Sequence, residues 1–195
     1  MKEKLFNPEN AYRLDDPMRL GFMPFQDVID CMDIKSGMTV VDIGVGTGYF
    51  AIPIARIVGE EGKVYAVDVQ PAMLEHLEKK VVHESLSSIF EIIEASAEDT
   101  SLPGACAHIV LMANLWHEID DHMAALEEVG RLLVPGGKLY ILDWRPDVER
   151  PPGPAIEHRI SATQVVAFLT ANGWKMDYNR NIGKYSYLLS AYPEI

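Results

Sequence analysis

Three glycines alternate with other residues directly after a short apolar run that ends in an acid, in the stretch VVDIGVGTG at residues 40–48. Gly44, Gly46 and Gly48 would let the backbone turn tightly and come close to a ligand, since no Cβ stands in the way. Asp68 ends another apolar run, KVYAVD, twenty residues after Gly48. A carboxylate at the tip of a neighbouring strand can accept hydrogen bonds from both hydroxyls of a ribose. The glycine loop and Asp68 together predict a nucleoside ligand.

The spacing of the glycines distinguishes between nucleoside ligands. A dinucleotide-binding loop has the pattern G-x-G-x-x-G, but here the third glycine comes one position early and Tyr49 fills its place. Without that glycine, close packing of the helix on the strand and approach to a pyrophosphate are both less favoured. The observed pattern is instead acid-x-G-x-G-x-G, beginning at Asp42. This spacing argues against a nicotinamide-dependent oxidoreductase.

Two histidines are candidates for acid–base chemistry. His117 follows an apolar run in ANLWHEI, and His158 lies beside Arg159 at the end of a proline-rich segment. An imidazole can take a proton from a hydroxyl or a carbon acid near neutral pH, and Arg159 would suit a carboxylate or phosphate on a substrate. The alternatives are a capping or hydrogen-bonded role for His117 and a solvated loop position for His158.

These residues require elements that bring them together, and the apolar pattern alternates between the periods of strands and helices. Strands are expected at residues 37–44, 62–69, 89–95, 107–114, 138–144, 174–178 and 185–192. Helices are expected at residues 49–59, 71–85, 120–134 and 161–173, with Pro71 and Ser161 as start signals and Gly59 and Gly173 as stops. The sequence Pro-Gly-Gly at 135–137 should close the third helix. The alternation predicts an α/β fold: a doubly wound sheet of seven strands, mostly parallel, with an antiparallel C-terminal hairpin strand at its edge.

Length and composition limit the classes of protein. The chain has 195 residues, of which 48% are hydrophobic, and this suits a single domain over residues 1–195. Its formal net charge is −12, so nucleic acid is not expected as a partner. The sequence shows no signal peptide or membrane span, and a cytoplasmic protein is expected. The six histidines show neither HxxxH nor HxH spacing, and Cys31 and Cys106 lie far apart, so free thiols and no metal site are expected.

With these motifs the chain resembles the class I S-adenosylmethionine-dependent methyltransferases, in particular the small-molecule subgroup of the ubiquinone/menaquinone-biosynthesis type. The resemblance is carried by VVDIGVGTG, VYAVDVQPAML, ASAEDTSLP, HIVLMANLWHEI and EEVGRLLVPGGKLYILDW, in this order along residues 40–144. It implies a Rossmann-like fold and S-adenosyl-L-methionine as the cofactor, with S-adenosyl-L-homocysteine as its product.

The resemblance also implies roles for single residues. Asp42 would face the methionine ammonium, and Asp68 would hold the ribose. Ser96 stands where many relatives carry an aspartate, so a neighbouring acid would have to supply the contact with the adenine. The cofactor-binding residues implied are Asp42, Gly44, Gly46, Gly48, Asp68, Val69, Met73, Ala97, Glu98 and Asn114, and the catalytic candidates are His117 and His158.

The expected reaction is an in-line displacement that moves the methyl group to a small organic acceptor. The stretch MANLWHE differs from the NPPY-like sequence of enzymes that methylate amides and bases, and two separate cysteines do not suit arsenite. Residues 1–35 and the proline-rich residues 145–160 are expected to cover the site, and the aromatic residues Phe6, Tyr12, Phe22 and Phe25 are candidates for an apolar acceptor pocket. A non-catalytic S-adenosylmethionine-binding module and a nicotinamide-dependent oxidoreductase remain alternatives. The oligomeric state stays open, with a homodimer among the choices.

Overall fold

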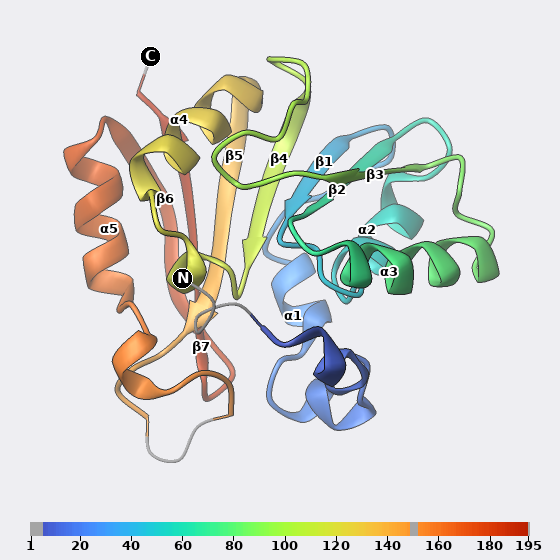
Figure 1. Cartoon of the computed structure of the whole chain (residues 1–195). Helices are drawn as coiled ribbons and strands as arrows, with labels where there is room; N and C mark the ends of the chain where they lie inside the picture. The colour runs from blue at the N-terminus through green and yellow to red at the C-terminus, as the bar shows by residue number, and fades with distance from the viewer. Residues whose placement is uncertain (1–5, 149–151, 195) are drawn as a thin grey trace.

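The computed structural model describes residues 6–148 and 152–194. Seven strands form one sheet in the order β3-β2-β1-β4-β5-β7-β6 (Figure 1). The strands are β1 (Thr39–Ile43), β2 (Lys63–Asp68), β3 (Phe90–Glu94), β4 (Ala107–Ala113), β5 (Leu133–Trp144), β6 (Trp174–Ile182) and β7 (Ser186–Pro193). Strands β1 to β5 pair in parallel, and β7 runs antiparallel to both β5 and β6. The predicted fold class is therefore confirmed.

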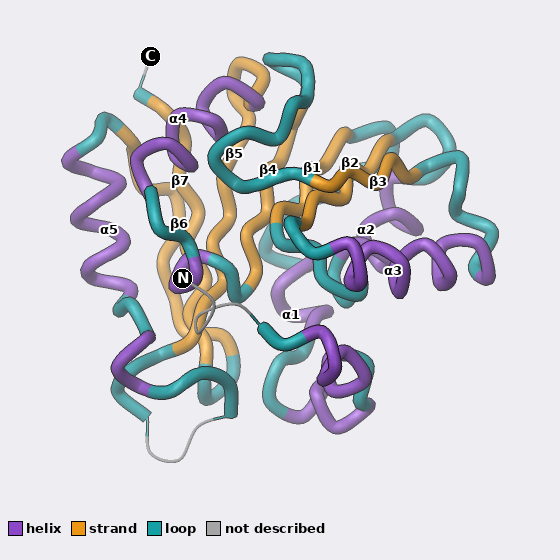
Figure 2. The backbone as a smooth tube through the Cα atoms, viewed as in Figure 1, coloured by secondary structure: helices purple, strands orange, loops and turns teal. Residues whose placement is uncertain are grey.

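Helices cover both faces of the sheet, as the alternating pattern requires. The α-helices are α1 (Phe25–Ile29), α2 (Ala51–Val58), α3 (Pro71–His83), α4 (His122–Leu132) and α5 (Ala162–Ala171). Apolar residues of α1, α2 and α3 pack with Val40 and Leu111 on one face, and those of α4 and α5 pack with Val41 and Val110 on the other. Because successive side chains of a strand point to opposite faces, one buried strand serves both cores. Figure 2 shows the strands between these two helical layers.

The predicted start and stop signals of three helices lie where the sequence puts them. Gly59 ends α2 with a φ of +68°, and Pro71 occupies the first turn of α3. The Ser161 side chain accepts the backbone N–H of Gln164 at the start of α5, while the Gln164 side chain accepts the N–H of Ser161. This capping box satisfies two N–H groups that would otherwise lack partners at the helix start.

Two details of the sheet differ from the prediction. The Pro-Gly-Gly stretch at 135–137 does not form a separate turn, because β5 begins at Leu133 directly after α4 and its register with β4 shifts between Ala107 and Ile109. The C-terminal hairpin also does not place its antiparallel strand at the edge. Strand β7 lies between β5 and β6, so the edge strand β6 runs parallel to β1.

Two irregular segments lie at the end of the sheet to which the parallel strands point. The first contains the 3-10 turns Pro8–Leu14 and Pro17–Gly21 and leads into α1. The second is the proline-rich connection between β5 and α5, with a 3-10 turn at Ile156–His158. Both are visible below the arrowhead of β4 in Figure 1, in dark blue and orange. Within the described residues, no helix is long and apolar enough to cross a membrane.

Candidate active site

A cavity of about 600 Å³ lies at the carboxyl ends of β1, β2 and β4. This is the edge where parallel sheets of this kind bind ligands, since the loops that follow neighbouring strands meet there. The lining combines the loops after these strands with both irregular segments, which contribute Phe6, Arg13, Leu14, Arg19, Phe22, Pro152, Gly153 and Pro154. The cavity is therefore closed over by chain that lies outside the sheet.

The glycine-rich loop follows β1 and forms the floor of the cavity. Gly44 and Gly46 both adopt left-handed conformations, with φ values of +74° and +52°. A Cβ on Gly44 would lie 2.9 Å from the Leu115 side chain, so both this contact and the positive φ favour glycine. The backbone N–H of Gly46 donates to Asp68 Oδ2 at 2.9 Å, which ties the loop to the tip of β2.

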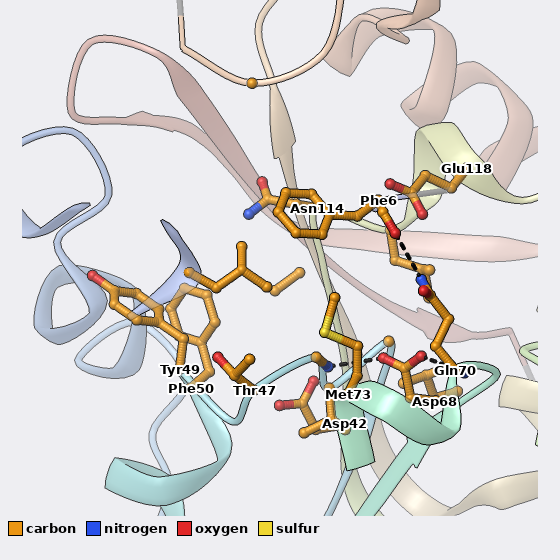
Figure 3. A pocket seen from close by; sticks show the side chains of 18 of the residues that line it. Phe6, Asp42, Thr47, Tyr49, Phe50, Asp68, Gln70, Met73, Asn114 and Glu118 are labelled. Atoms are coloured by element: carbon orange, nitrogen blue, oxygen red, sulfur yellow. Dashed lines mark hydrogen bonds between the residues drawn. The ribbon is translucent and has the colours of Figure 1, made fainter. Parts of the chain in front are cut away.

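Asp68 lies at the tip of β2 as expected, and its carboxylate organises two loops (Figure 3). Besides the Gly46 N–H, it accepts the backbone N–H of Gln70 through Oδ1 at 2.9 Å. Burial raises the pKa of Asp68, while these backbone N–H groups act to lower it. A carboxylate has about four lone-pair sites, so Asp68 retains the capacity to accept from a ligand hydroxyl.

Two buried oxygens in the cavity lining have no hydrogen-bond partner among the described residues: Asp42 Oδ1 and Asn114 Oδ1. Burial and the nearby charge of Asp68 raise the pKa of Asp42 to about 8. Asn114 adopts a φ of +57°, a left-handed conformation that Asn tolerates better than most residues. An unpartnered buried acceptor is costly. These two oxygens therefore suit a ligand that brings hydrogen-bond donors or positive charge.

Other predicted cofactor residues separate into those that line the cavity and those that do not. Val69, Met73 and Ala97 line it, together with Ala95 and Gln70. Ser96 instead accepts the backbone N–H of Asp99 within its own loop, at 3.2 Å. The apolar contacts expected around an adenine are thus in position, but a carboxylate is not.

Two predicted cofactor residues, Gly48 and Glu98, lie outside the cavity lining. Gly48 is needed for packing, since a Cβ there would lie 2.4 Å from the Leu77 side chain of α3. In the loop after β3, Ala97 lines the cavity, whereas the next residue, Glu98, does not.

His117 lies in the lining, in a 3-10 turn at Trp116–Glu118, and is buried. Its Nδ1 is 2.8 Å from Asp143 Oδ1, and its backbone N–H donates to Asp143 Oδ2 at 3.0 Å. Burial lowers the pKa of His117, but the hydrogen bond and charge of Asp143 raise it above its ordinary value. His117 is therefore hydrogen-bonded, which was one of the two expected alternatives, and it also lines the cavity.

His158 and Arg159 do not form the expected substrate-binding pair. His158 is exposed and lies outside the cavity lining. Arg159 is buried and donates to the carbonyl oxygens of Pro152, Pro154 and Arg145 at 2.6–3.0 Å. Because three backbone carbonyls hold its guanidinium, Arg159 stabilises the proline-rich loop and has little capacity for a carboxylate on a ligand.

Several lining residues were not predicted from the sequence. Arg13, Arg19 and Glu118 line the cavity, and burial raises the pKa of Glu118 to about 7. Of the four aromatic candidates, Phe6 and Phe22 line the cavity, whereas Tyr12 is exposed and Phe25 packs edge-on against Tyr49. Tyr49, Phe50 and Trp144 are the other aromatic residues of the lining. Only their position could have indicated these residues, because all lie near the carboxyl end of a strand or in a segment that covers that end.

The lining as a whole fits an elongated ligand with a nucleoside at one end and a positive charge at the other. The Asp68 carboxylate can accept hydrogen bonds from a ribose, and apolar side chains line the cavity around it. The buried oxygens of Asp42 and Asn114 have no hydrogen-bond donor among the described residues. S-adenosylmethionine has this composition: a nucleoside, a positively charged sulfur and an ammonium group.

Comparison with known sequences identifies the chain's relatives. Residues 41–141 match the family described as a methyltransferase domain. The ubiquinone/menaquinone biosynthesis C-methyltransferase UbiE of Escherichia coli is 30% identical over 123 residues, which cover 63% of this chain and 49% of that protein. The chain therefore spans about half the length of the curated relatives it matches.

Solved structures extend the likeness to almost the whole chain. A SAM-dependent methyltransferase from Aquifex aeolicus superposes with a TM-score of 0.90 at 33% identity, covering 96% of this chain and 98% of that one. The [4+2]-cyclase SpnF superposes with a TM-score of 0.76 at 15% identity, covering 88% and 80%, and shares the fold alone. By its matched family and its full-length relative, the chain belongs to the class I S-adenosylmethionine-dependent methyltransferases.

Proposed function

We propose that this methyltransferase acts on a small organic acceptor bound in the same cavity as the cofactor, with His117 as the group that accepts a proton. The observation that carries the proposal is the enclosure of the cavity. Residues 6–22 and 152–154 contribute to its walls, and both lie outside the sheet. A volume of about 600 Å³ is in the range of small-molecule pockets and must hold both reactants.

The N-terminal segment is fastened to the cavity on two sides. At one side, the Gln70 side chain donates to the backbone oxygen of Phe6 at 3.1 Å, and Figure 3 shows Phe6 beside Glu118. At the other, Asp15 accepts hydrogen bonds from the Thr47 hydroxyl and from Lys80. These contacts hold the segment across the site, which favours a molecule small enough to be enclosed over a protein or nucleic-acid chain.

The residues that would hold the cofactor are those already assembled at the strand tips. Asp68 would accept the ribose hydroxyls, Asp42 and Asn114 would face the ammonium, and Met73 and Ala97 would contact the adenine. S-adenosylmethionine supplies a methyl group that its positively charged sulfur activates toward nucleophiles. The apolar walls exclude water from the reacting groups, which strengthens the electrostatic contacts within the site.

His117 is oriented to take up the proton that the acceptor loses. Its Nδ1 is committed to Asp143, so the Nε2 atom is the ring nitrogen available to accept a proton. The negative charge of Asp143 stabilises the imidazolium that results. Glu118 Oε1 lies 3.8 Å from Nε2 and adds a second acidic group beside the ring.

The chemical class of the acceptor is inferred from its need to lose a proton and from the residues that line the cavity. Transfer to a carbon or to a hydroxyl oxygen forms a new bond to the methyl group and releases a proton, which His117 would bind. The curated relatives are named as C-methyltransferases of ubiquinone and menaquinone biosynthesis. A largely apolar acceptor with an acidic C–H or O–H also suits the aromatic side chains of Phe22, Tyr49 and Trp144 in the lining.

The experiment is an incubation of the purified protein with methyl-labelled S-adenosylmethionine and cell extract, separated afterwards into dialysable and macromolecular fractions. We expect enzyme-dependent label in the dialysable fraction, where mass spectrometry identifies the product. The Asp68→Ala variant should give much less label at a subsaturating cofactor concentration, since it should bind the cofactor more weakly. Label confined to protein or nucleic acid would contradict the small-molecule proposal.

A further inference from the structure

A buried cationic side chain in the cavity lining forms no ion pair among the described residues. Arg19 is only 9% exposed, and none of the ion pairs among residues 6–148 and 152–194 includes it. Its Nη1 donates to the backbone oxygen of Leu14 at 2.9 Å, and its Nη2 lies 3.6 Å from Met23 Sδ. A guanidinium has five N–H donors, so this environment leaves several of them for a ligand.

The surroundings fix this guanidinium in place without a direct ion pair. Its central carbon lies 4.0 Å from the centroid of the Tyr49 ring, a cation–π distance. The charge of Asp15 acts to raise the pKa of Arg19, but Asp15 forms no ion pair with it among the described residues, and its Oδ1 accepts from Thr47 and Lys80. Burial lowers the pKa of Arg19 to about 10, which leaves it charged near neutral pH. A buried, charged and unpaired group of this kind is costly unless an anion completes the site.

Arg19 lies at the end of the cavity that is farther from the ribose-binding acid. Figure 3 shows Tyr49, on which Arg19 stacks, across the view from Asp68 and Gln70, with Asp42 between them. The Asn114 side chain donates to Met23 Sδ at 3.1 Å, so Arg19 and Asn114 share one neighbour. Guanidinium donors are thus near an amide oxygen that lacks a partner.

This combination matches the two charges of an α-amino acid. Asp42 Oδ1 and Asn114 Oδ1 are buried acceptors without partners, suited to an ammonium, while Arg19 provides donors in the planar arrangement that matches a carboxylate. We propose that Arg19 binds the α-carboxylate of the cofactor's methionine part, while Asp42 and Asn114 bind its ammonium. The N-terminal segment would then take part in cofactor binding as well as in covering the acceptor.

The test compares two ligands that differ only in the carboxylate. S-adenosylhomocysteine and its decarboxylated analogue, which keeps the ammonium, are titrated into the full chain by calorimetry. The wild-type protein should bind S-adenosylhomocysteine more tightly by about tenfold or more, as expected for charge-assisted hydrogen bonds. Equal affinities in the wild-type protein would overturn the proposal without any variant.

Substitution assigns the preference to Arg19. Arg19→Met keeps an unbranched apolar side chain and should lose the preference, because binding of S-adenosylhomocysteine weakens while binding of the analogue does not. Arg19→Lys should retain part of it. Arg180→Met is the control, since Arg180 also lies over a tyrosine ring but is exposed and outside the cavity lining, and it should keep the full preference.

The remaining outcomes each contradict the assignment. Equal weakening of both ligands in Arg19→Met would make Arg19 a structural residue of the segment. Unchanged binding of both ligands with impaired acceptor turnover would move the anion to the acceptor. Because the readout is cofactor binding, a wrong acceptor class would leave this result intact.

Discussion

Asp143 holds His117 at two points, since its Oδ2 accepts the His117 backbone N–H at 3.0 Å and its Oδ1 lies 2.8 Å from Nδ1 of the ring. The same Oδ1 accepts the backbone N–H of Trp144 at 2.7 Å, and Asp143 is almost fully buried. The carboxylate therefore fixes both the position and the orientation of the imidazole at the end of β5.

His117→Ala should lower turnover on the identified acceptor by roughly 10²-fold while cofactor affinity stays within about threefold, because a positioned base acts on the acceptor side. Steady-state kinetics and calorimetry with S-adenosylhomocysteine separate the two effects. An affinity loss without a turnover loss would move His117 to the cofactor side, and unchanged turnover would leave it a structural residue.

Asp143→Asn should change the pH dependence of turnover as well as its maximum. The base must be neutral to act, so the rate should rise with pH through the pKa of His117, which Asp143 raises. Removing the negative charge lowers that pKa, so the rising limb should move to lower pH while the maximal rate falls. A profile of turnover against pH that keeps its rising limb in place would contradict the orienting role.

Asp42→Asn should stabilise the ligand-free protein as pH rises. Burial raises the pKa of Asp42 to about 8, whereas an unfolded aspartate ionises near about 3.9, so between these values only the folded chain holds the proton. Stability of the wild type therefore falls over this interval, and an asparagine avoids the loss. A gain of ~1 kcal/mol would raise the midpoint by about 2–4 °C.

Thermal unfolding of both proteins from about pH 5 to about pH 8 checks the Asp42 prediction, and the gap between them should widen with pH. The same variant should bind S-adenosylhomocysteine more weakly, since it cannot offer a carboxylate to the ammonium. A gap that does not change with pH would mean that Asp42 is not a buried acid with a raised pKa.

Gly48→Ala should destabilise the fold more than Gly136→Ala does. Both glycines have a φ above +80°, so an alanine at either position must adopt a left-handed conformation, which lowers the free energy of unfolding by roughly 1–2 kcal/mol. Only Gly48 adds a clash, with Leu77 2.4 Å from the new Cβ, whereas no heavy atom lies within 4 Å at Gly136. Overpacking of this kind costs roughly 1–3 kcal/mol more.

Urea unfolding of the two glycine variants gives the difference in the free energy of unfolding. Cofactor affinity of the folded Gly48→Ala protein should stay near that of the wild type, because Gly48 does not line the cavity. Equal stabilities of the two variants, or a selective loss of cofactor binding in Gly48→Ala, would contradict the packing role.

The parts of the site that the sequence predicts are those set by local rules. Asp42 and Asp68 end buried strands, and parallel strands bring their carboxyl ends to one edge, so the proximity of these residues follows from the order of elements. Gly44 and Gly46 follow from the need for left-handed backbone in a tight turn. The helix starts at Pro71 and Ser161 were likewise predicted from cap chemistry.

The parts that were missed depend on contacts between distant segments. The hydrogen bond between His117 and Asp143 joins residues 26 positions apart and depends on the register of β4 with β5, which no local sequence pattern predicts. Arg19 lies in a segment without a regular period, so its burial against Tyr49 follows only from how that segment folds over the cavity. Arg159 shows the converse, since its charge alone would suit a substrate carboxylate or phosphate, but its guanidinium binds backbone carbonyls.

The most direct measurement is a calorimetric titration of S-adenosylhomocysteine and NAD into the wild-type protein, Asp68→Ala and the control Glu98→Ala. The wild type should bind S-adenosylhomocysteine and not NAD, and Asp68→Ala should lose about tenfold to a hundredfold in affinity, as expected for hydrogen bonds to a charged acceptor worth roughly 1.5–3 kcal/mol. Glu98→Ala should bind like the wild type, because Glu98 lies outside the cavity lining. Unchanged affinity in a folded Asp68→Ala protein, or tighter binding of NAD by the wild type, would contradict the cofactor site described for this cavity.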